Sequence, residues 1–309
     1  MRILFFIATL FFSLQVSAVQ LNKFVVFGDS LSDSGNLYEY MKHQLPVSPP
    51  YYEGRFTNGP VWVELLNELY YPKGDTEHLL NYAFGGAGVV FPSEDDDDDS
   101  FFTLNTEIDS YLLAHQDKAD PNSVFIVWMG SNNYLGIPDN VDEAVHNVNA
   151  GIVIGLKHLV EKGAKHIMVI NLPDLGKTPA ARDFEAEDVL SEATTKNNLL
   201  LEQNVSALKE TYPDVQWLFF DVNSLLTDVL QQPGTYGFTN VKDTCYEELF
   251  DNPSSKSILA MVSTIKPRLG HDACDGYLFF DPVHPSAPAH VLMANKIKEL
   301  FEQSGIVFG

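Results

Sequence analysis

The stretch that decides the fold is Phe24-Val25-Val26-Phe27-Gly28-Asp29-Ser30-Leu31-Ser32-Asp33-Ser34-Gly35-Asn36. Its apolar start, rich in Val and Phe, predicts a buried strand, and the polar, glycine-bearing run behind it predicts a turn. In α/β folds with a parallel sheet, functional groups gather at the carboxyl ends of the strands. Ser30 follows such an end and is therefore a candidate nucleophile. The same pattern is also typical of a plain turn or a helix cap.

Apolar runs alternate with amphipathic runs along the rest of the chain. Strands are expected at 23–27, 80–84, 123–129, 166–171 and 215–220, and helices at 60–70, 105–115, 141–162, 188–212, 222–230 and 287–303. This alternation is typical of a parallel sheet that is covered by helices on both faces. We therefore predict an α/β fold, a three-layer α/β/α sandwich with a mostly parallel five-stranded sheet.

The amino-terminal residues predict export. Arg2 precedes an apolar run, and Val16-Ser17-Ala18 supplies small residues at a cleavage site, so residues 1–18 are expected to be a secretory signal peptide. The protein is then secreted, to the extracellular space or the periplasm. The apolar run is short for a membrane span, and no other stretch predicts a transmembrane segment. Residues 19–309 are expected to form a single catalytic domain, because no linker composition divides them.

Charge and cysteine content exclude several classes of function. The chain has 42 Asp and Glu against 19 Lys and Arg, and a net charge of −23, which disfavours binding to nucleic acid or to an anionic membrane. Cys245 and Cys274 predict one disulfide in an exported protein, with two buried thiols as the alternative. No metal site or cofactor is expected, since no histidine stands at ligand spacing from either cysteine. The run Asp95–Asp99 is expected to form a solvated loop rather than a calcium site, because adjacent carboxylates repel.

A second polar motif is Phe279-Phe280-Asp281-Pro282-Val283-His284-Pro285-Ser286. A general base needs one fixed tautomer, and a carboxylate three residues away on a proline-bracketed turn can hold His284 in it. The alternative is a turn histidine with an aspartate cap. Two further segments, 81–88 and 130–133, follow predicted strands and offer backbone N–H groups and an amide as oxyanion donors.

These four blocks, together and in this order, resemble those of the GDSL esterases and lipases, also called SGNH hydrolases. The run Asn171-Leu172-Pro173-Asp174-Leu175-Gly176-Lys177-Thr178-Pro179 is also similar to a stretch of the lipase branch. The similarity extends over nearly the whole chain after residue 18. It points to the secreted bacterial branch that contains phospholipases A, lysophospholipases A and acyltransferases.

The resemblance implies a catalytic triad. Ser30 would be the nucleophile, His284 the general base and then acid, and Asp281 the group that orients His284.

The resemblance also implies an oxyanion hole. Its donors would be the N–H groups of Ser30 and Gly86 and the side-chain amide of Asn132, with Gly85 as the alternative to Gly86. The family usually has Asp where this chain has Asn133, so a role for a charge at that position is in doubt.

The function implied is hydrolysis of lipid acyl esters, namely those of lysophospholipids and phospholipids at a micelle or membrane surface. The acyl-enzyme could also transfer its acyl group to an alcohol. A carbohydrate acetylesterase of the same fold and an inactive secreted binding protein are the alternatives. Seven aromatic residues are expected either to line an acyl groove and contact a micelle or to be ordinary core and rim: Tyr38, Tyr40, Tyr51, Tyr52, Phe56, Phe101 and Phe102.

The segment between Cys245 and Cys274 has polar, proline-bearing ends and an apolar middle at 258–265. We expect either a lid, whose movement or cleavage by an activating protease raises activity, or a passive stapled loop.

Overall fold

The computed structural model describes residues 19–89, 102–245, 247–248, 265–266 and 274–309. The expected signal peptide, the aspartate run and most of the loop between the cysteines lie outside these residues. At the centre is a five-stranded sheet whose strands are all parallel. Its order is β3 (Leu79–Asn81), β2 (Lys23–Gly28), β4 (Ser123–Trp128), β5 (His166–Ile170) and β6 (Gln216–Phe220). The five predicted strands and their parallel pairing are thereby confirmed.

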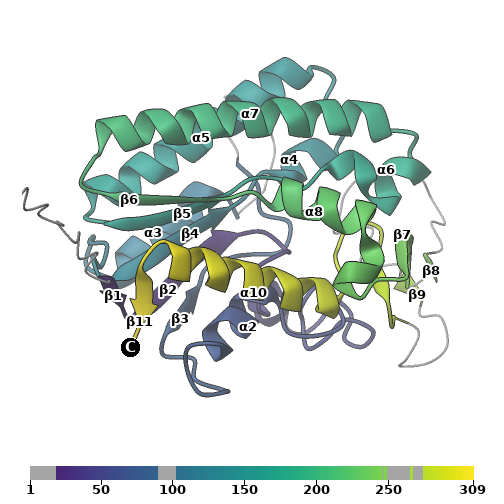
Figure 1. Cartoon of the computed structure of the whole chain (residues 1–309), viewed down its shortest axis with the longest axis horizontal. Helices are drawn as coiled ribbons and strands as arrows, with labels where there is room; N and C mark the ends of the chain where they lie inside the picture. Colours follow the sequence, from purple (N-terminus) through teal and green to yellow (C-terminus); the bar gives the residue numbers. More distant parts are fainter. Residues whose placement is uncertain (1–18, 90–101, 246, 249–264, 267–273) are drawn as a thin grey trace, which may run out of the picture.

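Helices cover both faces of the sheet (Figure 1). Side chains of a strand point alternately to opposite faces, so Val25 and Phe27 pack on one side and Phe24 and Val26 on the other. The first face is covered by α3 (Leu104–Ala114), α5 (Val141–Glu161) and α7 (Glu187–Thr211). The second face is covered by α2 (Trp62–Glu68) and α10 (Ala287–Gln303). The α/β/α sandwich predicted from the sequence is therefore confirmed.

Polar caps set the first residues of several helices. The side chains of Thr103, Asn140 and Asp221 accept backbone N–H groups at the starts of α3, α5 and α8 (Val222–Gln231). Helix α2 begins at Trp62, two residues after Pro60. The sequence did not predict the five-residue helices, because they are too short to show a helical period: α1 (Asn36–Tyr40), α4 (Ser131–Leu135) and α6 (Pro179–Asp183).

Shorter strands and turns complete the described chain. Strand β1 (Val19–Leu21) pairs in parallel with β11 (Ile306–Phe308), and β7 (Asn240–Thr244) pairs in parallel with β10 (Tyr277–Phe279). The remaining elements are the antiparallel pair β8 (Glu247–Glu248) and β9 (Ile265–Lys266) and the 3₁₀ turns η1 (Leu175–Lys177) and η2 (Pro233–Tyr236).

A disulfide joins Cys245 and Cys274, as predicted. It lies beside the β7–β10 pair, and the Cys245 N–H donates to the Phe279 carbonyl at 3.1 Å. The bond therefore anchors the segment that leads into Asp281. Within the part of the chain that the structure describes, no helix has the length and apolarity needed to cross a bilayer.

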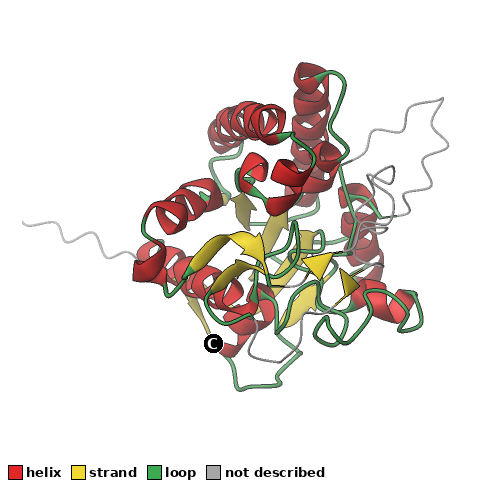
Figure 2. Cartoon of the chain, turned by 90° about the vertical axis from the view of Figure 1, so that its right-hand side faces the viewer, coloured by secondary structure: helices red, strands yellow, loops and turns green. Residues whose placement is uncertain are grey.

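Because all five central strands run in the same direction, their carboxyl ends share one edge of the sheet. Figure 2 looks onto the molecule from that side, with the strands at the centre, helices around them and loops in front. The polar segments that follow β2, β3 and β4 meet at this edge.

The aromatic cluster around Phe24 should dominate the stability of the second face. Phe24 is fully buried, and its ring lies 4.2 Å from that of Phe308 and 6.3 Å from that of Phe301. Phe24→Ala should lower the free energy of unfolding by about 3–5 kcal/mol, measured by urea denaturation. Phe308→Ala, at a half-buried position of the same cluster, should cost less. A loss below about 1 kcal/mol for Phe24→Ala would contradict this assignment.

Candidate active site

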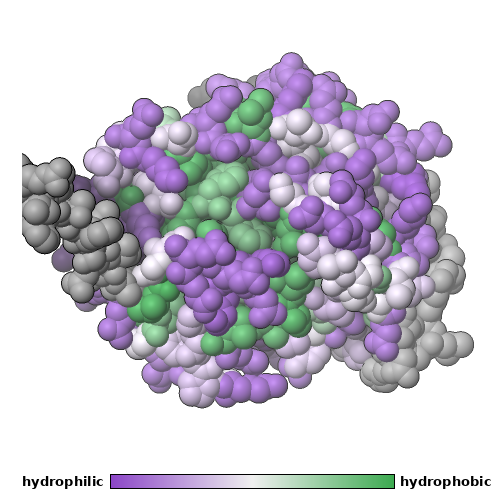
Figure 3. Space-filling view, viewed as in Figure 1, coloured by the Kyte–Doolittle hydropathy of each residue, from purple (hydrophilic) through white to green (hydrophobic). Residues whose placement is uncertain are grey.

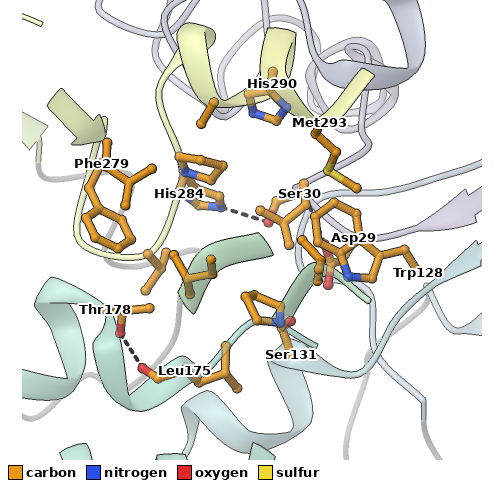
Figure 4. Close-up of a pocket in the computed structure, with 18 of the residues that line it drawn as sticks. Asp29, Ser30, Trp128, Ser131, Leu175, Thr178, Phe279, His284, His290 and Met293 are labelled. Carbon is orange, nitrogen blue, oxygen red and sulfur yellow. Dashed lines mark hydrogen bonds between the residues drawn. The ribbon is translucent and has the colours of Figure 1, made fainter. Parts of the chain in front are cut away.

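Ser30, His284 and Asp281 form a continuous hydrogen-bonded chain. His284 Nε2 lies 2.8 Å from Ser30 Oγ (Figure 4). His284 Nδ1 lies 2.6 Å from Asp281 Oδ2. All three residues are buried. The structure thus brings together two sequence-predicted blocks that are separated by 254 residues. This is the geometry in which an imidazole can take a proton from a hydroxyl while a carboxylate holds its other nitrogen.

The turn that carries His284 is fixed by backbone hydrogen bonds. The Phe280 N–H donates to the His284 carbonyl at 2.9 Å, and the Ala180 N–H at the start of α6 donates to the Pro282 carbonyl at 3.0 Å. Thr57 Oγ1 donates to the Pro285 carbonyl at 2.8 Å. Two distant segments, those of Ala180 and Thr57, therefore hold this turn in addition to its internal hydrogen bond, and the imidazole does not rely on the turn alone for its position.

Tyr51 is a site residue whose role was not foreseen. Its hydroxyl donates to Asp281 Oδ2 at 2.7 Å, while Asp281 Oδ1 accepts the N–H groups of Val283 and His284 at 2.9 and 2.7 Å. Hydrogen-bond partners within the protein therefore take the place of water at both oxygens of the carboxylate. The ring of Phe56 lies 5.2 Å from that of His284. Tyr51 and Phe56 are buried beside the triad, whereas Tyr40 and Tyr52 are exposed.

The two glycines that follow β3 differ in their contacts. The Gly85 N–H donates to Asp33 Oδ2 at 2.7 Å, and a Cβ at Gly85 would come within 2.3 Å of the Phe56 ring. Gly86 has a φ of 81°, in the left-handed region. Among the described residues, the Gly86 N–H makes no hydrogen bond. Of the two N–H groups, that of Gly86 is therefore the one available to a ligand.

The other proposed donor, Asn132, lies in the first turn of α4 and lines the pocket beside Ser30. Its Nδ2 donates to the Ala87 carbonyl at 2.7 Å. An amide nitrogen carries two hydrogens, so one remains for a ligand while the other fixes the side chain to the segment that contains Gly86.

Two buried carboxyls hold the loops at this edge. Asp33 accepts the N–H groups of Gly35, Asn36, Leu37 and Gly85. Glu107, on α3, accepts the N–H of Gly28 at the end of β2 at 2.8 Å and that of Phe84 at 3.3 Å. Burial raises the pKa of Asp33 to about 6 and raises the pKa of Glu107 well above its ordinary value.

The sequence contained a signal for Glu107. It lies inside the apolar stripe of α3 that Leu104, Ile108 and Tyr111 form, where a charged residue is out of place unless it has partners.

An apolar pocket of about 110 Å³ opens beside Ser30 and His284. Much of its wall is aliphatic and aromatic, and three elements contribute a large part of it: Leu225, Leu226 and Val229 from α8, Leu278 and Phe279 from β10, and Leu292 and Met293 from α10. Figure 3 shows an apolar hollow between α10 and β6. The aromatic residues suggested by the sequence are not among those that line this pocket; Phe101 lies outside the described residues.

Two titratable side chains line the pocket besides His284. His290 Nδ1 accepts the Trp62 N–H at 3.2 Å, and burial lowers the pKa of His290 to about 3, so its ring is neutral. Asp29 precedes Ser30 and accepts the Leu31 N–H at 3.0 Å, and burial raises the pKa of Asp29 to about 6.

The chain belongs to the GDSL-like lipase/acylhydrolase family, whose model matches residues 24–297. A phosphatidylcholine-sterol acyltransferase from Aeromonas hydrophila is 29% identical over 91% of this chain and 90% of its own. The secreted effector protein SseJ of Salmonella typhimurium is 28% identical, and the thermolabile hemolysin of Vibrio parahaemolyticus 27% identical. The match covers 62% of SseJ and 89% of this chain, and 64% of the hemolysin and 91% of this chain. This chain therefore spans less than two thirds of these two longer relatives.

Among solved structures, Est24, a carbohydrate acetylesterase from Sinorhizobium meliloti, is similar over 91% of this chain and all of its own. The two are 15% identical, with a TM-score of 0.49. With the site geometry and the family match, the chain is a member of an ester-hydrolase family.

The raised pKa of Asp29 makes stability depend on pH. The folded protein binds the proton of the Asp29 carboxyl more tightly than the unfolded chain does. Ionisation of this carboxyl therefore does not lower stability below about pH 4, and it lowers stability by its full amount above about pH 6. The free energy of unfolding of Asp29→Asn minus that of the wild type should therefore increase by about 3 kcal/mol from pH 4 to pH 7, measured by urea denaturation at several pH values. Asp228→Asn, which removes an exposed carboxyl on α8, is the control. A difference that does not change with pH would exclude this role of Asp29.

Proposed function

We propose that this protein is an exported serine hydrolase that cleaves long-chain acyl esters of lysophospholipids and phospholipids. Residues 19–309 act as one catalytic domain in this proposal, without a metal or organic cofactor. The observation that carries it is the apolar pocket that opens directly beside the Ser30–His284 hydrogen bond. An acyl chain fits such a pocket, whereas a sugar ring needs polar partners for its hydroxyl groups.

The hydrogen bonds of the site support the following catalytic roles. His284 Nε2 takes the Ser30 proton as Ser30 Oγ attacks the ester carbonyl, and Asp281 stabilises the imidazolium that forms. The N–H groups of Ser30 and Gly86 and the Asn132 amide stabilise the oxyanion.

The imidazolium of His284 then protonates the leaving alcohol, and an acyl ester remains on Ser30. Water attacks this ester with the same general base and releases the fatty acid. An alcohol that replaces this water would accept the acyl group, so the same site also supports acyl transfer. The Aeromonas relative is a phosphatidylcholine-sterol acyltransferase, which supports this second reaction.

Export is supported by the disulfide and by the secreted effector among the relatives. The lid and its activating protease depend on residues that lie mainly outside the described ones, so they stay predictions. Comparing activity before and after limited proteolysis between Cys245 and Cys274 tests them.

Substrate class is tested with a panel of esters. The purified protein should release fatty acid from long-chain lysophosphatidylcholine faster than acetate from acetylated xylan, and Ser30→Ala should lower either rate to the blank. Preference for the acetylated sugar would instead support the carbohydrate acetylesterase. No hydrolysis by a folded wild-type protein would support the binding protein. Residual activity of Ser30→Ala within tenfold of the wild type would exclude Ser30 as the nucleophile.

The pocket itself is tested by chain length. Leu226→Trp places a large ring in the pocket and should lower kcat/KM for a sixteen-carbon p-nitrophenyl ester by on the order of tenfold, with little effect on the acetate. Thr227→Trp, at an exposed neighbouring position on α8, is the matched control and should leave both rates unchanged. An equal loss for both esters in Leu226→Trp would show that the acyl chain binds elsewhere.

A further inference from the structure

Asn133, the residue that departs from the family pattern, makes a two-way contact with the backbone. Its Oδ1 accepts the Val89 N–H at 2.8 Å, and its Nδ2 donates to the Val89 carbonyl at 2.6 Å. The Asn133 amide thus bonds both the backbone N–H and the backbone carbonyl of Val89, as the backbone of a neighbouring strand would. Gly88 leaves room for this approach, since a Cβ there would lie 3.2 Å from Asn133 Oδ1.

This contact fixes one end of the segment that contains Gly86. On its other end, the Phe84 N–H donates to the Gly28 carbonyl at 3.0 Å and to Glu107 at 3.3 Å, and Asp33 accepts the Gly85 N–H. Between the two ends, the Gly86 N–H has no acceptor among the described residues. The position of this N–H relative to Ser30 therefore depends on anchors at both ends.

A carboxylate could not replace the Asn133 amide. It would accept the Val89 N–H, but its second oxygen would face the Val89 carbonyl oxygen at the place where Nδ2 now donates. Two facing acceptors repel, and the buried carbonyl would lose its partner. A protonated carboxyl, in contrast, has an O–H that can donate to the Val89 carbonyl and restores both contacts.

We propose that Asn133 is a positioning residue: its amide, through Val89, holds the Gly86 N–H in the geometry that stabilises the oxyanion. The inference rests on the proposed function of the same site. In this chain the neutral amide of Asn133 stands where the family usually has an Asp, and the inference gives this amide the positioning role. The donor half of the amide is the essential part, because the acceptor half is common to Asn and Asp.

The test compares kcat and KM of Asn133→Asp with the wild type from pH 5 to pH 8.5 on a soluble short-chain ester. At pH 8 the variant should have a kcat lower by on the order of 10- to 100-fold and a KM within about threefold, since only transition-state stabilisation is lost. The ratio of variant to wild-type kcat should rise by about tenfold towards pH 5, as the introduced carboxyl gains its proton.

The ratio is the readout because other groups around this segment titrate in both proteins. They are the carboxyls of Asp29, Asp33 and Glu107. Asn133→Ala should lower kcat with a ratio that does not change with pH. Asn140→Asp introduces the same carboxyl at the exposed cap of α5 and should match the wild type throughout.

Titration of reactive serine with an organophosphate counts the folded sites, so kcat is expressed per competent site even if a variant folds poorly. A kcat of Asn133→Asp equal to the wild type at pH 8, or a ratio that stays flat on acidification, overturns the inference. A wild-type protein without Ser30-dependent esterase activity overturns the proposed function, and this inference with it. An active wild type with a flat ratio overturns this inference alone.

Discussion

The catalytic edge depends on hydrogen bonds from loop backbone to buried carboxyls. The parallel sheet brings the ends of β2, β3 and β4 to one edge, and beyond these ends several backbone N–H groups donate to side chains rather than to a neighbouring strand. Glu107 ties the end of β2 to the segment after β3, and Asp33 ties the turn after Ser30 to Gly85. Without these groups, several buried N–H donors would lack acceptors.

Burying these carboxyls lowers the stability of the fold, as their raised pKa values indicate. A carboxyl that accepts four N–H groups would ordinarily be more acidic than in water, yet burial raises the pKa of Asp33 to about 6. The desolvation penalty thus exceeds what the hydrogen bonds recover. Replacing these carboxyls with apolar side chains would remove that penalty but would also leave the loops without anchors, and proteins commonly accept lower stability where a site needs fixed geometry.

The sequence was sufficient to predict those helices and strands whose apolar residues repeat with a clear period. The strand around Val25 and the long helices at 141–161 and 187–211 carry enough residues for the alternation to be unambiguous, and their bounds agree with the structure to within a few residues. The helix α4 has five residues, so its existence follows only from tertiary contacts such as those of Asn132 and Asn133. The triad candidates were found because each stands in a local motif.

The remaining site features were beyond the sequence because they join distant segments. The choice between Gly85 and Gly86 is made by the contacts of Asp33 and Phe56, and nothing within the double glycine encodes it. Tyr51 reaches Asp281 across 230 positions of the chain. Much of the pocket wall comes from α8, β10 and α10, whose apolar residues look in sequence like ordinary core.

The electrostatics of the molecule and of its pocket differ, and this difference bears on how a lipid would arrive. The chain carries a net charge of −23, which disfavours long-range attraction to an anionic membrane. The pocket walls are largely apolar, and the buried His290 that lines it is neutral because burial lowers its pKa to about 3. Recognition of a lipid ester would then depend on burial of its acyl chain at short range, which contributes about 0.8 kcal/mol per methylene group. A substrate with a short acyl group gains little from such a pocket, so discrimination would come from the length of the chain rather than from the charge of the headgroup.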